Sequence, residues 1–191
     1  FDVTGVEPSA AAVHVARTRY TLHVVEGTLE VARFPDRSFD VIFMSHVFEH
    51  LPNLVTTLQE MHRVLDVGGL IVLKIPNIAS ASARRFGPYW LGLDVPRHLY
   101  HFSPETMTRL LEGHGFSVKR IRHDLGSWGF WQESRLIQTQ AAHGTARGPS
   151  RRRSAVDQLI ETLACWRRQG SNIVVYAQKR DGRCHETPGS L

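Results

Sequence analysis

The chain has 191 residues, of which 42% are hydrophobic and 21% charged, and it carries a net charge of +5. This length and composition are typical of one globular domain and exclude a disordered or collagen-like chain, and no apolar run approaches the roughly 20 residues of a membrane span. The first residues lack the basic and apolar segments of a secretion signal, so we expect a cytoplasmic protein.

Short apolar runs alternate with helical patterns through residues 1–124, which predicts a mostly parallel sheet. Residues 1–7 are the first expected strand, and Ser9 can cap a helix that runs from there to about residue 20. Residues 22–25 form the second expected strand. Residues 39–45 are apolar enough to be buried on both faces, which favours the centre of the sheet for them.

Asn53 can cap the next helix, whose apolar residues recur at three or four positions up to Leu65 and which Gly68-Gly69 can end with a positive φ. Residues 70–75 are the fourth expected parallel strand. Residues 77–102 show no clean period, and a segment of that length without regular structure is usually functional. Ser103, followed by Pro104 and Glu105, then caps a short helix that runs to about residue 113.

Residues 116–122 and 172–179 are the last expected strands, an antiparallel pair at one edge of the sheet. A mainly helical insertion over 125–170, clearest at 154–168, separates them. We therefore expect a single domain over 1–180, with its core at 1–124, its last strand at 171–180 and a flexible tail at 181–191.

The excess positive charge lies after residue 124, because residues 1–124 carry 13 basic and 13 acidic side chains. Its densest point is Arg147 with Arg151, Arg152 and Arg153, among glycine, proline and serine. That segment has no interleaved aromatic residues and no nucleic-acid motif, which favours a solvated linker over a phosphate-binding patch. The two cysteines, Cys165 and Cys184, are too few for a disulfide framework or a cysteine zinc site, in keeping with a reducing compartment.

The first expected strand ends in Glu7, just before a helix. Nucleotide-binding sheets use a carboxylate there to hold both ribose hydroxyls, although acids also end strands for solubility. The segments V-E-P-S, E-G-T-L-E, F-P-D-R-S-F-D-V-I, V-F-E-H-L-P, R-V-L-D-V-G-G-L and I-P-N follow one another in this order. Together, over residues 1–124, they resemble a class I S-adenosylmethionine-dependent methyltransferase, of the branch that includes the ubiquinone-biosynthesis O-methyltransferases.

This resemblance implies a Rossmann-like α/β fold with S-adenosyl-L-methionine as the cofactor. It implies that Glu7 binds the ribose hydroxyls and that Pro8 lies near the adenine. Thr28 and Leu29 would contact the adenine edge, where many relatives have Asp in place of Thr28. The wall beside the methionine part would consist of Ser45, His46 and Val47.

Methyltransferases of this class place a strand and a glycine-rich loop before the acidic strand. This chain starts inside the acidic strand, and its 15 glycines include no G-x-G-x-G. We therefore expect an N-terminally incomplete fold in which the flank of residues 1–7 exposes unpaired backbone groups. Such an edge favours pairing with another chain, so self-association is expected.

Residues 97–102, R-H-L-Y-H-F, follow the last parallel strand, where open α/β sheets place their substrate crevice, and they resemble a motif of the same branch. A histidine there could take a proton from an acceptor near neutral pH, or could serve as a packed loop anchor. The aromatic residues Trp128, Phe130 and Trp131 could cover an apolar substrate or pack the insertion. The candidate catalytic residues are His46, His98 and His101, and the candidate substrate-binding residues are Asn77, Arg97 and Tyr100.

Residues 46–50, H-V-F-E-H, also match an inverted zinc-protease signature. That signature requires one continuous helix, whereas an apolar strand precedes His46 and Pro52 follows His50. We therefore expect no metal site, and we place Glu49 and His50 at a helix start and the pocket floor.

The expected reaction is methyl transfer from the cofactor to an oxygen, nitrogen or carbon nucleophile of a small molecule. The sulfonium supplies the reactivity and the protein aligns the reacting atoms. A nicotinamide dehydrogenase fragment would share the role of Glu7 but leaves F-P-D-R-S-F-D unexplained. A noncatalytic binding or interaction domain is the other alternative, because the missing glycine loop removes part of the cofactor site.

Overall fold

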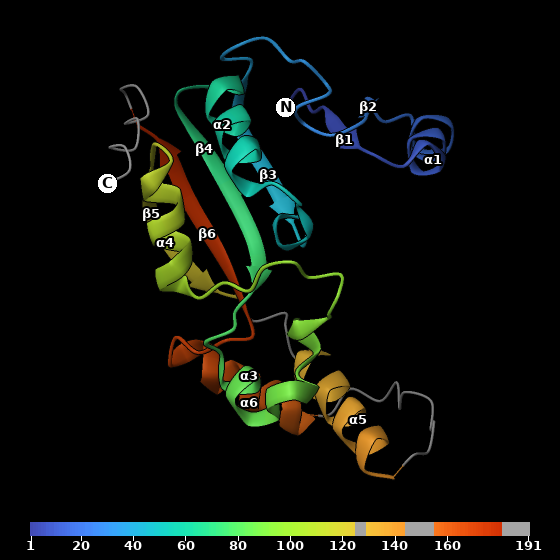
Figure 1. The fold of residues 1–191 in the computed structure, drawn as a ribbon, viewed down its shortest axis with the longest axis vertical. Helices are drawn as coiled ribbons and strands as arrows, with labels where there is room; N and C mark the ends of the chain where they lie inside the picture. Colours follow the sequence, from blue (N-terminus) through green and yellow to red (C-terminus); the bar gives the residue numbers. More distant parts are fainter. Residues whose placement is uncertain (125–128, 144–154, 181–191) are drawn as a thin grey trace, which may run out of the picture.

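The computed structural model describes residues 1–124, 129–143 and 155–180, and it has two sheets (Figure 1). The first pairs β1 (Gly5–Glu7) with β2 (Val24–Glu26) in parallel, and α1 (Ala10–Tyr20) connects them. The second has the strand order β3-β4-β6-β5. Its strands are β3 (Phe39–Ser45), β4 (Leu65–Pro76), β5 (Phe116–His123) and β6 (Asn172–Lys179). β3 and β4 are parallel, while β6 runs antiparallel to both of its neighbours.

The predicted α/β class and the antiparallel pair at one edge are confirmed, but the prediction of one sheet centred on residues 39–45 is wrong. Among the described strands, β1 and β2 pair with each other alone, and β3 lies at an edge. Val41 and Phe43 in β3 are 53% and 65% exposed. An apolar run indicates a strand but does not reveal whether protein covers both its faces, and here it borders a cavity.

The remaining helical elements connect these strands. They are the 3-10 turns η1 (Phe48–His50), η2 (Gly87–Tyr89) and η3 (Leu91–Leu93), and the helices α2 (Leu54–Val64), α3 (Ala81–Phe86), α4 (Pro104–Gly113), α5 (Gly129–His143) and α6 (Ala155–Trp166). The segment 77–102 therefore contains a short helix and two 3-10 turns, contrary to the expectation of no regular structure. Within the described residues, none of these helices has the length and apolar character that a membrane crossing requires.

The predicted helix caps are confirmed. The side chains of Ser9, Asn53 and Ser103 each accept a hydrogen bond from a backbone N–H in the first turn of the helix that follows. The predicted end of α2 at Gly68-Gly69 is wrong, because the chain turns extended at Leu65 and enters β4 directly. Gly68 does adopt a positive φ of 72°, but within the long strand.

The main core lies between the four-stranded sheet and two helices, α2 and α4. Ile71, Leu73 and Ile75 of β4 alternate with less buried residues and are fully buried, as the period of a strand requires. Leu58 of α2 and Leu111 of α4 belong to the same apolar cluster. This core holds β4 in place, so the carboxyl ends of β3 and β4 have fixed positions.

The helices of the insertion form a second packed unit at the carboxyl end of β4 (Figure 1). Trp131 packs edge-on against Phe86 at 5.5 Å between ring centroids, which is the packing role considered for it. Its indole N–H donates to the buried Glu161 carboxylate at 2.5 Å, and Ser171 donates to the same carboxylate from both its backbone and its hydroxyl. Trp128, Cys184 and the arginines at 147 and 151–153 lie outside the described residues.

Candidate active site

A cavity of about 550 Å³ lies between the β1–β2 unit and β3, and we call it the inter-sheet cavity. Its walls come from β1, the turn after β2, β3 and the start of α2. Of the predicted cofactor residues, Pro8, Thr28, Leu29 and Val47 all line it. Small-molecule sites have volumes of about 300–1,000 Å³ and mostly apolar walls, and this cavity is of that kind.

Glu7, Ser45 and His46 are not among the residues that line the inter-sheet cavity, although each is next in sequence to one that does. Glu7 ends β1, and its Oε1 accepts the backbone N–H of Ser9 at 2.8 Å. Ser9 in turn caps α1. The strand end therefore places a carboxylate at the helix start, as the sequence predicted.

Glu30 is a cavity residue that the sequence reasoning missed, although it ends the quoted segment E-G-T-L-E. Its Oε1 accepts the hydroxyl proton of Thr57 at 2.6 Å. Burial by itself raises the pKa of Glu30, but hydrogen bonds from Thr57 and Thr28 outweigh it and hold that pKa below its usual value. The cavity wall therefore carries an ionised carboxylate, which suits a ligand that offers hydroxyl or amino donors.

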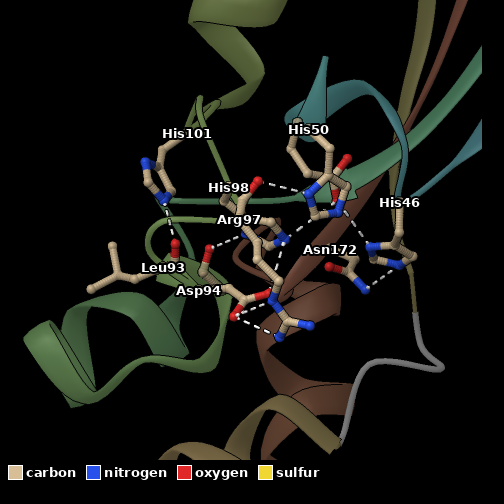
Figure 2. Close-up of polar contacts among 10 residues, drawn as sticks. His46, His50, Leu93, Asp94, Arg97, His98, His101 and Asn172 are labelled. Atoms are coloured by element: carbon tan, nitrogen blue, oxygen red, sulfur yellow. Dashed lines mark hydrogen bonds and ion pairs between the residues drawn. The ribbon is translucent and has the colours of Figure 1, made fainter. Parts of the chain in front are cut away.

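His46 follows β3 in a left-handed conformation with a φ of 53°, uncommon outside glycine. Its Nδ1 lies 3.2 Å from Oε1 of Glu49, and its Nε2 lies 3.5 Å from Nδ2 of Asn172 (Figure 2). A carboxylate can only accept and an amide nitrogen can only donate, so the ring proton belongs on Nδ1. Among the described residues, the Nε2 lone pair then faces the long amide contact alone, which is the arrangement of a general base oriented by a carboxylate.

Three histidines lie around Glu49. We call His46, Glu49, His50 and His98 the Glu49 cluster. Glu49 is 1% exposed, and its Oε2 has no hydrogen-bond partner among the described residues. Nε2 of His98 lies 3.9 Å from Oε1 of Glu49, and the rings of His50 and His98 are 4.7 Å apart. This grouping was missed in the sequence, because His98 comes from a loop far along the chain.

Residues 46–50 do not form the continuous helix that the inverted zinc-protease signature requires. η1 is a single turn of three residues and begins two residues after His46, so His46 and His50 share no helix. The Glu49 cluster instead joins the end of β3, η1 and the loop that contains His98 (Figure 2).

The other predicted residues do not line the inter-sheet cavity. Arg97 donates twice to Asp94, and Nε2 of His101 lies 2.9 Å from the Leu93 carbonyl oxygen (Figure 2). Tyr100 and His101 line a second cavity of about 410 Å³ between the starts of α2 and α4. Asn77 is buried. Its side-chain amide donates to the Gly170 carbonyl oxygen and accepts from the Ala79 N–H. The two cavities share Asn53 in their linings.

Comparison with known proteins places these features in a wider group. Residues 1–121 match a family model described as a methyltransferase domain. A malonyl-[acyl-carrier protein] O-methyltransferase of Serratia marcescens is 32% identical over 108 residues, which are 56% of this chain and 42% of that protein. A probable S-adenosylmethionine-dependent methyltransferase of Mycolicibacterium smegmatis is 30% identical over 143 residues, covering 74% of this chain and 51% of that protein. The chain thus spans about half the length of these curated relatives.

Among solved structures, a SAM-dependent methyltransferase of Thermotoga maritima, described as a possible histamine N-methyltransferase, aligns with a TM-score of 0.61. The alignment covers 93% of this chain and 72% of that one, at 20% identity. At this identity the likeness establishes a shared fold.

Proposed function

Because the chain belongs to the methyltransferase domain family, whose cofactor is S-adenosyl-L-methionine, we propose that it transfers a methyl group from that cofactor to an oxygen, nitrogen or carbon nucleophile of a small molecule. The family expected from the sequence is confirmed by the match over residues 1–121. The cofactor supplies a methyl group activated by its sulfonium, so the protein has to bind and align it.

The observation that carries this proposal is the lining of the inter-sheet cavity. Pro8, Thr28, Leu29 and Val47 come from three separate segments, and each is a position at which the family resemblance implies cofactor contact. The ionised Glu30 adds an acceptor for hydroxyl or amino groups, while Val6 and Phe34 add apolar wall. The volume of the cavity, its apolar walls and the Glu30 carboxylate, which accepts from hydroxyl or amino groups, all fit an adenosine-containing ligand.

Within the proposed reaction, His46 takes the proton of the acceptor at Nε2. Glu49 holds the ring in the tautomer that leaves this lone pair available. His98 and His101 each have one ring nitrogen within 3 Å of a backbone carbonyl oxygen, and neither has a carboxylate at hydrogen-bond distance among the described residues. Their role in the proposal is to position the loop of residues 97–101.

The test is a calorimetric titration of the 191-residue chain with S-adenosylhomocysteine, with circular dichroism to verify folding. We expect saturable binding to one site per chain. A folded chain that shows no binding would contradict the proposal and favour the noncatalytic alternative. If binding is found, transfer of a labelled methyl group to a panel of hydroxyl and amine acceptors then tests the reaction, and His46→Gln should lower its rate without abolishing cofactor binding.

A further inference from the structure

The Glu49 cluster contains more acceptor atoms than the proposed methyl transfer uses. Glu49, His50 and His98 each place one ligand-type atom within 4.8 Å of the other two. Oε1 of Glu49 accepts from His46, but Oε2 is buried and has no hydrogen-bond partner among the described residues. A buried carboxylate oxygen without a donor is costly unless a cation compensates it.

Each of the two histidines has its Nδ1 at hydrogen-bond distance from a backbone carbonyl oxygen. Nδ1 of His50 lies 2.8 Å from the Arg97 carbonyl oxygen, and Nδ1 of His98 lies 2.8 Å from the Gly92 carbonyl oxygen (Figure 2). Carbonyl oxygens only accept, so both rings carry their proton on Nδ1 and, when neutral, a lone pair on Nε2. Metal-binding histidines typically have their other ring nitrogen fixed in this way by a carbonyl or carboxylate.

Three acceptor groups that converge without a cation repel one another. We propose that Glu49, His50 and His98 bind one divalent transition-metal ion, with zinc as the representative ion. Two imidazoles and one carboxylate form a ligand set that such ions favour, whereas magnesium and calcium prefer oxygen ligands alone.

The three ligand atoms lie within 4.8 Å of one another and have to move closer together to coordinate an ion. Zinc in tetrahedral coordination keeps its ligand atoms roughly 3.3–3.6 Å apart, and Nε2 of His98 is already 3.9 Å from Oε1 of Glu49. Asp94, whose Oδ2 lies 3.8 Å from the same nitrogen, adds negative charge beside the site. Three protein ligands leave a fourth position for water or for an oxygen or nitrogen of a bound molecule.

The ion would also link two parts of the fold. Glu49 and His50 belong to η1, while His98 lies in the loop before α4. A metal bridge would hold this loop against the end of β3, so occupancy should raise the melting temperature. The proposal is independent of the proposed function, because metal binding is measured without cofactor or acceptor.

The experiment titrates zinc into the metal-free 191-residue chain and follows binding by calorimetry. We expect one ion per chain and weaker binding of magnesium. Glu49→Gln, His50→Ala and His98→Ala should each weaken zinc binding by at least about 100-fold, since even outer-shell partners are typically worth 10–100-fold. His14→Ala removes an exposed histidine of α1 and should leave the affinity unchanged.

X-ray absorption of the zinc-loaded wild-type chain keeps the test independent of whether the variants fold. It should show two imidazole nitrogens among the ligands. Absence of stoichiometric binding, a ligand shell without imidazole, or folded Glu49, His50 and His98 variants that bind zinc like the wild type would each overturn the proposal. Protonated imidazoles would then account for the cluster.

Discussion

Nε2 of His98 lies 3.9 Å from Oε1 of Glu49, although the two residues belong to different connections of the fold. A backbone bond produces this approach: the N–H of Leu99 donates to the Glu49 carbonyl oxygen at 2.9 Å. This main-chain hydrogen bond holds the loop of residues 97–101 against η1. The side chain of His98, the residue before Leu99, is thereby placed near Glu49. The proposed metal site, which uses both side chains, depends on this main-chain contact.

Glu7→Ala should weaken binding of S-adenosylhomocysteine by about 1.5–3 kcal/mol, the range for loss of a charge-assisted hydrogen bond. Calorimetry measures the affinity. Glu7→Gln keeps an acceptor for the Ser9 N–H, so it separates loss of the charge from loss of the turn. Glu105→Ala, at an exposed position of α4, is the control. Unchanged affinity in a folded Glu7→Ala variant would remove Glu7 from the cofactor site.

The stability of the protein should fall as the pH drops below the ordinary histidine pKa, partly because of His62. Burial and then the nearby Lys179 charge lower the pKa of His62, whose ring packs against Phe116. The unfolded chain therefore takes up the proton first, and stability present above about pH 6.5 is lost as the pH falls toward the folded-state pKa. His62→Leu should flatten this decline in denaturant unfolding measured between pH 8 and pH 5. A variant with the wild-type slope would contradict the assignment, and His14→Gln is the exposed control.

Cys165 should resist thiol reagents in the native protein. Burial, and then the neighbouring Glu161 carboxylate, raises the pKa of its thiol to about 12, so almost no thiolate forms at pH 8. A Cys184→Ser background leaves Cys165 as the single thiol. Labelling with a chromogenic disulfide at pH 8 should be much slower in buffer than in denaturant. Equal rates in the two conditions would show that Cys165 is accessible in the folded chain.

Two glycine substitutions should have opposite effects on stability. A Cβ at Gly69 would lie 2.9 Å from the Asp66 carbonyl oxygen and 3.2 Å from that of Asp40, both backbone atoms. Gly69→Ala should therefore destabilise the protein by about 1–3 kcal/mol, the usual cost of overpacking. Gly113→Ala, in α4 where a Cβ meets nothing within 4 Å, should be neutral or stabilise by up to about 1 kcal/mol. Denaturant midpoints of the two variants test the pair, and a neutral Gly69→Ala would contradict it.

Local features of the fold could be predicted from the sequence because they depend on neighbouring residues. The caps at Ser9, Asn53 and Ser103 are side-chain contacts within one helical turn. The strand of residues 172–179 was predicted with its observed bounds, since it is a short β-branched run next to polar ends. The ordered motifs that contain Glu7, Thr28-Leu29 and Val47 identified the family, which the match over residues 1–121 confirms.

Only the tertiary structure decided how these pieces meet. The apolar pattern of β3 is the same for a central strand and for an edge strand beside a cavity, so its position depends on backbone pairing with distant strands. Glu49 and His98 are likewise ordinary residues of two loops in the sequence. A main-chain hydrogen bond between those loops brings them together. Any residue type can form such a bond, so the amino-acid sequence does not indicate where it forms.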